Sequence, residues 1–301
     1  MRIGIDLGGT KIEIVALDDA GAVRFQRRVL TPRDDYDATI GAIEQLVRAA
    51  ESALGCCCTV GLGIPGAETP ETGLIKNANS TWLIGRPFRA ELSRALGREV
   101  RLANDANCLA VSEATDGAAA GSAVAFAVIL GTGTGGGLVV NGQLIVGANS
   151  IGGEWGHNPL PQATDEERPG PACYCGRFGC IETFLSGPGL AADYARRTHS
   201  GEQLTSEHVV TRAASGEPAA LAALDVWEDR LARSLGTVIN VVDPDVIVMG
   251  GGLSQIERIY TNVPARWGRY IFSDRVVTRL VPAVHGDASG VRGAAWLWER
   301  T

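Results

Sequence analysis

One His and three Cys stand at metal-ligand spacing in the middle of the chain: His157, then Cys173, Cys175 and Cys180. An imidazole and three thiolates suit a closed tetrahedral Zn²⁺ site, which leaves no coordination position open for chemistry. A disulfide between Cys173 and Cys175 is disfavoured because the two residues are too close in the chain to pair. The spacing predicts a structural zinc that holds a loop in place; the alternative is a set of free thiols in a glycine-rich loop.

Two carboxylates, Glu154 and Glu182, bracket this loop. Together with His157 they are polar groups that could hold several hydroxyls of a polyol at once. The segment KNANSTW at 76–82 adds amides and an aromatic ring, a composition that suits sugar recognition. For Asn77 an ordinary surface loop is the alternative.

Three glycine-rich turns each follow an apolar run: DLGGTK at 6–11, GTGTGGG at 131–137 and GGGL at 250–253. Glycine lets backbone N–H groups approach an anion closely, and Thr hydroxyls add donors. A single turn of this kind is more often a hairpin, but three together indicate phosphate binding. The predicted nucleotide contacts are Asp6, Gly8, Gly9, Thr10, Lys11, Gly131, Thr132, Gly133, Thr134, Gly135, Gly251 and Gly252.

Asp6 is acidic within a turn that otherwise attracts anions. A carboxylate beside a triphosphate is unfavourable unless a divalent cation lies between them, so Asp6 predicts Mg²⁺, bound directly or through water. The alternative is a carboxylate that caps the turn. Asp105, in NDAN at 104–107, stands where a strand meets a helix. It is a candidate general base for phosphoryl transfer, with a helix N-cap as the alternative.

Two other nucleotide motifs are excluded. The chain has no GxxxxGK followed by Ser or Thr, so it is not a P-loop protein. The spacing GxGxxG does occur at 131–136, but the dinucleotide fingerprint must open a helix. Here the next segment is a strand that ends at an Asn141–Gly142 hairpin signal, so this motif fails on its context.

The pattern of the segments that must position these residues predicts an α/β fold. Apolar residues alternate on both sides of the turn at 8–11, and helical spacing follows over 36–54. The pattern of strand, glycine turn and strand begins again at 123–130. The chain therefore predicts a duplicated α/β fold, with a nucleotide cleft between domains 1–120 and 121–301. Whether the last helix returns to the first domain stays open.

The composition limits the class of partner. A net charge of −7 over 301 residues disfavours nucleic acid, which needs a basic face. The longest apolar run, 123–130, is far shorter than the roughly 18 residues that span a bilayer. Asp6 also stands where a signal peptide would be apolar. We therefore expect a cytoplasmic protein with neither nucleic acid nor membrane as a partner.

The motifs DLGGTK, GIPG, NDAN, ILGTGTGGG, GEWGHNPLP, CYCGRFGCIE and DPDVIVMGGG occur in this order over nearly the whole chain. In this the chain resembles the bacterial sugar kinases of the ROK family, in the actin and hexokinase superfamily. The resemblance implies an ATPase fold that binds ATP and Mg²⁺ and phosphorylates a hexose. It implies Asp105 as the catalytic base, and His157 and the three cysteines of its loop as zinc ligands. The implied sugar contacts are Asn79, Asn104, Asp105, Glu154, His157 and Glu182.

Within the family, TPRDDY at 31–36, KNANSTW and GHNPLP look most like fructokinases that also accept mannose. The expected reaction is transfer of the γ-phosphate to the 6-hydroxyl of fructose, by a homodimer. N-acetylglucosamine or N-acetylmannosamine kinase and glucokinase are the alternatives, and Trp82 is expected to fill the space that an N-acetyl group needs. A sugar-sensing repressor is less favoured, because a DNA-binding segment would precede the strand that starts at Ile3.

Overall fold

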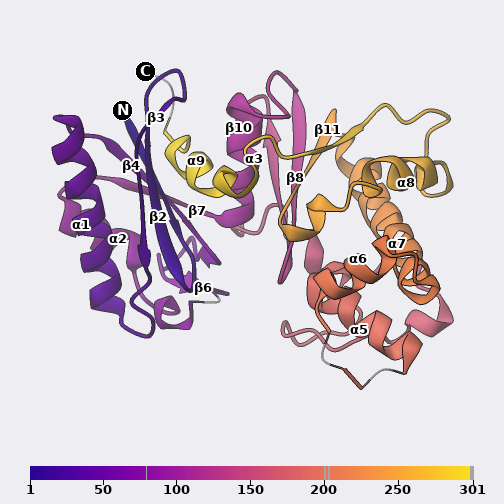
Figure 1. The fold of residues 1–301 in the computed structure, drawn as a ribbon. Coiled ribbons are helices and arrows are strands. Elements are labelled where there is room, and N and C mark those ends of the chain that lie inside the picture. Colours follow the sequence, from indigo (N-terminus) through magenta and orange to yellow (C-terminus); the bar gives the residue numbers. More distant parts are fainter. Residues whose placement is uncertain (79, 200, 203, 299–301) are drawn as a thin grey trace. The chain divides into compact units, whose positions relative to one another are not determined.

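The computed structural model describes residues 1–78, 80–199, 201–202 and 204–298 (Figure 1). The chain divides into two compact units. The first comprises Met1–Gly121, Gly137–Gly153 and Ala283–Thr301, and the second comprises Ser122–Gly136 and Glu154–Pro282. Within the described residues, no helix is long and apolar enough to cross a membrane.

A five-stranded sheet, in the order β3-β2-β1-β4-β7, forms the centre of the first unit. Its strands are β1 (Arg2–Leu7), β2 (Lys11–Leu17), β3 (Val23–Leu30), β4 (Thr59–Ile64) and β7 (Val100–Asn104). The first three strands are an antiparallel meander, whereas β4 and β7 run parallel to β1. The carboxyl ends of β1 and β7 therefore lie at the same edge, which is where the chain carries Asp6 and Asn104.

The helix α1 (Tyr36–Leu54) packs an apolar stripe against this sheet. Asp35 caps its first turn by accepting a hydrogen bond from the Ala38 N–H (2.9 Å), and the helix ends at Gly55, which is left-handed. The buried stripe includes Ile43 and Val47. The other elements are β5 (Ala67–Glu68), β6 (Ile75–Lys76), η1 (Thr81–Leu83), α2 (Phe88–Leu96), α3 (Asp105–Asp116), β10 (Gln143–Leu144) and η6 (Gly286–Ala288).

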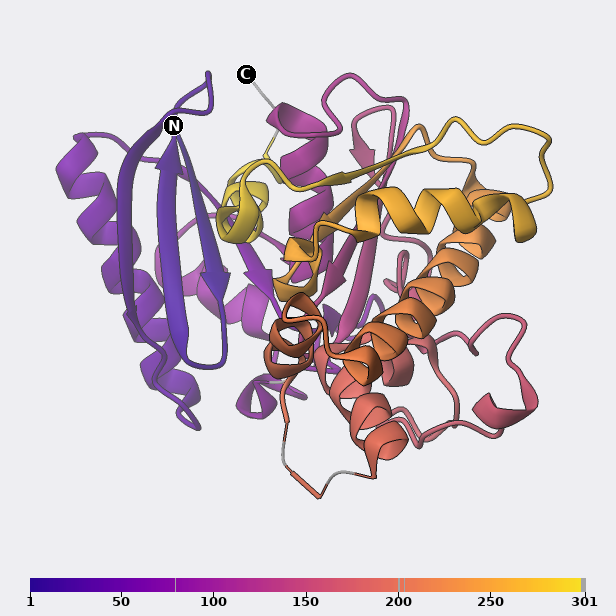
Figure 2. The ribbon, with the colours of Figure 1, turned by 45° about the vertical axis from the view of Figure 1, so that its right-hand side comes forward.

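The helix α9 (Ser289–Ala295) returns to the first unit and lies beside β1, β4 and α3 (Figure 2). Its backbone approaches the sheet at two glycines. A Cβ on Gly4 would lie 2.0 Å from the Val291 carbonyl oxygen, and one on Gly61 would lie 1.8 Å from that of Ala294. Neither position has room for a side chain, so the pairing of α9 with β1 and β4 depends on these glycines.

A second five-stranded sheet has the order β10-β9-β8-β11-β12, and the division between the units falls within β9 (Thr134–Val140). The strand β8 (Val124–Leu130) runs parallel to β11 (Val246–Gly250), which in turn is parallel to β12 (Arg279–Pro282). The helices of the second unit are α4 (Ile181–Leu185), α5 (Gly187–Thr198), α6 (Ser206–Ala214), α7 (Pro218–Val242) and α8 (Ile259–Arg266). Its short 3₁₀ segments are η2 (Trp155–His157), η3 (Asp165–Glu167), η4 (Gly252–Gln255) and η5 (Trp267–Arg269).

The predicted α/β class is confirmed, and both sheets contain the expected unit of strand, glycine turn and strand. The second glycine turn is shorter than predicted, because β9 already begins at Thr134. Gly137, expected in the turn, is a strand residue. A Cβ there would lie 2.7 Å from the Ala106 carbonyl oxygen of α3, so glycine serves a close approach between β9 and α3.

Candidate functional site

Two carboxylates of the first unit lie at the carboxyl edge of its sheet. Asp6 is near the end of β1, and Asp105 is the first residue of α3. Asn104 is the N-cap of α3: its Oδ1 accepts from the Ala106 N–H (2.8 Å), and its Nδ2 donates to the Gly66 carbonyl (3.3 Å). Asp105 Oδ1 also accepts from the Ala106 N–H (2.8 Å). The N-cap position belongs to Asn104, so the N-cap alternative for Asp105 is wrong.

The pKa of Asp6 is raised to about 6, firstly by burial and then by the negative charge of Asp105. Lys11 and Arg28 oppose this shift. A buried carboxylate beside a second carboxylate forms a place where a divalent cation is favourable. This electrostatic pair fits the Mg²⁺ predicted at Asp6.

Asp6→Asn is expected to stabilise the metal-free protein at neutral pH. The folded-state pKa of about 6 lies above the ordinary value of 3.8. The folded state therefore holds a proton that the unfolded state releases between these values, and stability falls as the pH rises through this window. Asn avoids the loss, so the variant should gain about 1–3 kcal/mol over wild type at pH 7 and much less at pH 4.

The measurement is thermal unfolding of both proteins in chelator at several pH values, with the exposed Asp37→Asn variant as the control. An advantage of Asp6→Asn that is the same at pH 4 and pH 7 would contradict the raised pKa.

The turn between β1 and β2 is closed by its own backbone. The Gly8 N–H donates to the Lys11 carbonyl (3.0 Å), and the Thr31 hydroxyl donates to the Gly8 carbonyl (2.8 Å). Thr10 and Lys11 are exposed, and the space beside Gly9 is open. The accessible groups of this turn are therefore its tip and the Lys11 side chain, whereas the Gly8 N–H already has a partner.

In the second unit, a cavity of about 660 Å³ brings together three of the predicted nucleotide contacts, Gly131, Thr132 and Gly252. Its remaining lining is Gly187, Pro188, Ala191, Leu204, Thr205, Ser206, Glu207, Val210, Thr211, Leu253, Gln255 and Ile256. Apolar walls with a few polar groups suit a nucleobase and ribose. The residues from α6 were missed by sequence reasoning, because isolated apolar and hydroxyl residues on a helix carry no motif.

The structure does not bring Thr134 and Gly135 to this cavity. The Thr134 hydroxyl is buried and has no hydrogen-bond partner within the described residues. The Thr134 N–H donates to Glu182 Oε2 (2.9 Å), and a Cβ on Gly133 would lie 2.7 Å from the same oxygen. The Gly135 carbonyl accepts from Trp155 Nε1 (2.9 Å). Thr134 and Gly135 therefore hold Glu182 and η2 beside the turn. Gly251 is the N-cap of η4 and has a positive φ of 81°.

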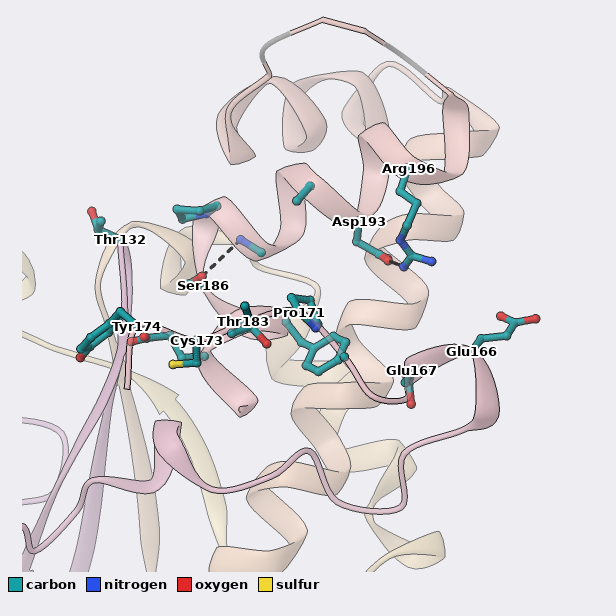
Figure 3. Close-up of a pocket in the computed structure, with 17 residues that line it drawn as sticks. Thr132, Glu166, Glu167, Pro171, Cys173, Tyr174, Thr183, Ser186, Asp193 and Arg196 are labelled. Atoms are coloured by element: carbon teal, nitrogen blue, oxygen red, sulfur yellow. Dashed lines mark hydrogen bonds and ion pairs between the residues drawn. The ribbon is translucent and has the colours of Figure 1, made fainter. Parts of the chain in front are cut away.

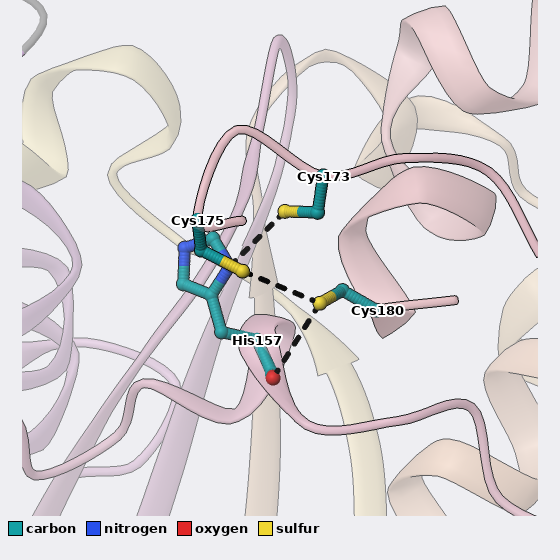
Figure 4. A group of neighbouring side chains, drawn as sticks. All are labelled: His157, Cys173, Cys175 and Cys180. Atoms are coloured by element: carbon teal, nitrogen blue, oxygen red, sulfur yellow. Dashed lines mark hydrogen bonds between the residues drawn. The ribbon is translucent and has the colours of Figure 1, made fainter. Parts of the chain in front are cut away.

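The four predicted zinc ligands converge in one metal-ligand cluster (Figure 4). His157, Cys173, Cys175 and Cys180 place their donor atoms within 4.8 Å of one another. Nδ1 of His157 lies 3.5 Å from Cys173 Sγ, and the Sγ atoms of Cys175 and Cys180 are 3.6 Å apart. A tetrahedral zinc with ordinary bond lengths has edges of about 3.6–3.8 Å, so the donor set and its spacing fit this metal.

Tyr174, which sequence reasoning missed, contacts this cluster through His157. Its hydroxyl lies 2.9 Å from His157 Nε2, and the two rings pack edge to face with centroids 5.1 Å apart. The ring of Tyr174 is largely exposed, but desolvation of its hydroxyl, and then the charges of Glu182 and Glu154, raise the pKa of Tyr174 to about 12. The second nitrogen of His157, predicted to face a sugar hydroxyl, thus contacts a phenol in this structure.

A second cavity, of about 570 Å³, extends from Thr132, Tyr174 and Glu182 to Asp193 on α5 (Figure 3). Glu167, which lines this cavity, belongs to a buried charge network. Glu167 Oε1 accepts from Arg230 Nε (2.8 Å) and from Arg233 Nη2 (2.6 Å), both on α7. Burial alone would raise the pKa of Glu167, but the hydrogen bonds from Arg233 and Arg230 hold it at about 2. The network ties the metal-ligand loop, residues 157–180, to α7.

Glu167→Gln is expected to destabilise the protein by about 3 kcal/mol, because it removes the carboxylate that two buried guanidinium groups share. Arg230 then keeps only Asp193 (3.1 Å) and Arg233 only Asp229 (3.6 Å) as an ion-pair partner. Urea unfolding at pH 7 measures the change. The matched control is Glu166→Gln, which removes the neighbouring exposed carboxylate and should have almost no effect. Equal effects of the two substitutions would contradict the role of this network.

The predicted sugar contacts fall in both units. Asn104 and Asp105 belong to the first, and Glu154, His157 and Glu182 to the second. Glu154 is exposed and directly precedes η2. Asn79 lies outside the described residues.

Trp82 packs against the core of the first unit, and its indole N–H donates to the Thr39 hydroxyl of α1 (3.2 Å). This indole supports η1 on α1, a structural role that explains its presence without any exclusion of an N-acetyl group.

The comparisons with known proteins correct the expected subtype. The chain is 42% identical over 301 residues to a protein named N-acetyl-D-glucosamine kinase from Escherichia coli O6:H1, with 99% of each chain covered. The fructokinase assignment from TPRDDY, KNANSTW and GHNPLP is therefore wrong, and this relative carries the name of one of the alternatives. These three segments therefore do not identify the acceptor sugar.

Two solved structures share the fold. A ROK hexokinase from Thermus thermophilus is 30% identical with a TM-score of 0.87, over 98% of this chain and 96% of that one. A ROK-family glucokinase from Streptomyces griseus is 24% identical with a TM-score of 0.79, over 100% of this chain and 99% of that one. They support the hexokinase-like ATPase fold. The ROK family model matches residues 2–301, so this chain belongs to the ROK family.

Proposed function

We propose that this protein is an ATP-dependent N-acetyl-D-glucosamine kinase. The observation that carries the proposal is the 42% identity, over 99% of both chains, with a protein of that name. The acid pair of the first unit, the nucleotide-sized cavity of the second and the polar groups around the metal-ligand cluster support it. The acceptor atom is the primary 6-hydroxyl, the least hindered nucleophile of a hexose.

Asp105 is the general base in this proposal. Its carboxylate accepts the proton of the sugar hydroxyl as the hydroxyl oxygen bonds the γ-phosphorus and the bond to ADP breaks. Asn104 caps α3 and accepts from Ala106 N–H, which fixes the backbone that carries Asp105. Alignment of the hydroxyl and removal of its proton are the main tasks of the protein in phosphoryl transfer.

The nucleotide contacts divide by chemistry. The cavity of about 660 Å³ takes the base and ribose, with Leu204, Val210 and Ile256 as apolar walls and Thr132 at the phosphate end. Asp6 holds Mg²⁺, directly or through water, and that cation would neutralise phosphate charge. The raised pKa of Asp6 supports this role, because bound cation favours its ionised form.

In this proposal, His157 and the three cysteines hold a structural zinc, which would keep the metal-ligand loop folded. Glu154, Glu182 and Nε2 of His157 bind sugar hydroxyls. The hydrogen bond from the Thr134 N–H fixes Glu182 Oε2, and the metal-ligand loop fixes the His157 ring. Two carboxylates and an imidazole suit a neutral polyol because they offer directed hydrogen bonds.

The test is a coupled ADP-release assay with ATP and Mg²⁺ over N-acetylglucosamine, N-acetylmannosamine, glucose, mannose and fructose. The expected result is the highest kcat/KM for N-acetylglucosamine. A higher value for glucose or N-acetylmannosamine would keep the reaction class and overturn the acceptor assignment. No ADP release with any of the five sugars would overturn the kinase proposal itself.

A further inference from the structure

The two ring nitrogens of His157 face different partners. Nδ1 lies 3.5 Å from Cys173 Sγ in the metal-ligand cluster, and Nε2 lies 2.9 Å from the Tyr174 hydroxyl. The rings of His157 and Tyr174 meet nearly at right angles (87°). The phenol thus occupies the edge of the imidazole that is not turned toward the sulfur atoms.

A ring nitrogen of His offers one hydrogen or one lone pair in the ring plane, so it makes one good hydrogen bond at a time. The proposed function gives Nε2 of His157 to a sugar hydroxyl, and the inference rests on that assignment. A sugar hydroxyl and a phenol hydroxyl are the same kind of partner, because each can donate and accept. The sugar and Tyr174 therefore require the same atom.

The surroundings of Tyr174 allow its side chain to leave without moving the cluster. Its backbone lies in a tight turn, closed by hydrogen bonds from the Cys173 N–H to the Arg177 carbonyl (2.8 Å) and from the Gly176 N–H to the Cys173 carbonyl (3.0 Å). The residue is nevertheless 76% exposed. A rotation about the side-chain bonds can carry the ring into solvent while Cys173 and Cys175 stay in place.

Tyr174 also lies among the other polar groups proposed for the sugar. Together with Glu182 it lines the cavity of about 570 Å³, and the charges of Glu182 and Glu154 act on its hydroxyl. The phenol hydroxyl therefore contacts the imidazole and experiences the charge of both carboxylates that the proposed function assigns to sugar hydroxyls. These contacts distinguish Tyr174 from Phe178, an exposed aromatic residue of the same hairpin that has no hydroxyl.

We propose that Tyr174 is an internal competitor of the sugar. Its hydroxyl holds Nε2 of His157 in the sugar-free enzyme and is displaced when the acceptor binds. Tyr174 is thus a specificity-determining residue, because only an acceptor whose hydroxyl replaces the phenol at Nε2 recovers the hydrogen bond that is lost. It also keeps the His157 ring in its binding orientation when no sugar is present.

The test is calorimetric titration of zinc-loaded wild type and Tyr174→Phe, without nucleotide, with N-acetylglucosamine, glucose and mannose. Loss of the hydroxyl removes the competing hydrogen bond, so the sugar Kd of Tyr174→Phe should fall about 2- to 10-fold. Tyr174→Ala should shift the Kd in the same direction. Phe178→Leu is the matched control and should leave the Kd unchanged, and equal zinc content in all four proteins shows that the cluster is intact.

An unchanged or higher sugar Kd in Tyr174→Phe overturns the proposal. The hydroxyl would then have no effect on sugar binding, or would contact the sugar directly. The wild-type titrations test the acceptor assignment separately. If wild type binds glucose or mannose in preference to N-acetylglucosamine, the proposed acceptor is wrong, and the ratio of Kd values for the preferred sugar decides the role of Tyr174. Wild type that binds none of these sugars overturns both.

Discussion

Asp105→Asn is expected to lower kcat by about 10²- to 10⁴-fold, the range over which general-base assistance contributes, and to leave the Kd for the sugar within about twofold. Asn has nearly the same shape as Asp and keeps an oxygen that can accept from the Ala106 N–H, but it cannot take a proton from a hydroxyl. The N-cap of α3 is unaffected because Asn104 provides it. The ADP-release assay measures kcat, and titration calorimetry measures the sugar Kd.

The control for this substitution is Asp37→Asn, an exposed carboxylate in the first turn of α1, which should leave both constants unchanged. If Asp105→Asn retains more than about a tenth of the wild-type kcat, Asp105 is not the base. If both kcat and sugar affinity collapse while the protein stays folded, Asp105 is chiefly a binding residue.

Cys175→Ser is expected to abolish binding of the proposed zinc and to unfold the metal-ligand loop, with a large drop in Tm. Structural zinc contributes on the order of 10 kcal/mol of folding free energy, and a Ser hydroxyl is a poor substitute for a thiolate. Loop unfolding should also remove sugar binding, because His157 takes its orientation from the cluster. Metal analysis gives the zinc content, and calorimetric scanning gives the Tm.

The matched control is Cys57→Ser, an exposed thiol far from the cluster in sequence, which should keep zinc and Tm unchanged. Wild type treated with a strong chelator should behave like Cys175→Ser and should recover on addition of Zn²⁺. Normal stability and sugar affinity in metal-free protein would contradict a structural role of the metal.

The sequence was sufficient for the fold class and for the convergence of the four metal-ligand side chains, for different physical reasons. Strand alternation around Ile3 and Ile12 is a local consequence of a sheet with a buried face. The ligand set is also partly local, because Cys173 and Cys175 are separated by a single residue and Cys180 follows one turn later. Only His157 comes from further away in the chain, and an imidazole beside three thiols is the usual fourth ligand of such a metal site.

The contact of Tyr174 with His157 could not be predicted from the chain. A Tyr at that position does not indicate a contact with His157 until the hairpin closed by Cys173 and Arg177 places its ring. The walls of the larger cavity were missed for a similar reason. Leu204, Val210 and Ile256 come from separate segments of the chain, and each is an ordinary apolar residue in its own segment. Such sites arise from tertiary packing rather than from spacing.

The acceptor sugar was wrongly assigned from short segments that the structure uses for other purposes. Trp82 illustrates this, because its indole supports η1 against α1 through Thr39. A residue committed to packing carries little information on the ligand. Discrimination between hexoses depends on the placement of a few polar atoms, which motif matching does not resolve.

The close packing of α9 on Gly4 and Gly61 also determines the order in which the chain can mature on the ribosome. The first sheet is synthesised early, yet the helix that covers β1 and β4 lies at Ser289–Ala295 and emerges after the whole of the second unit. Until then one face of the nascent first sheet remains uncovered, and the second unit can complete its fold first. The first sheet, although made first, is therefore completed only after α9 has been made.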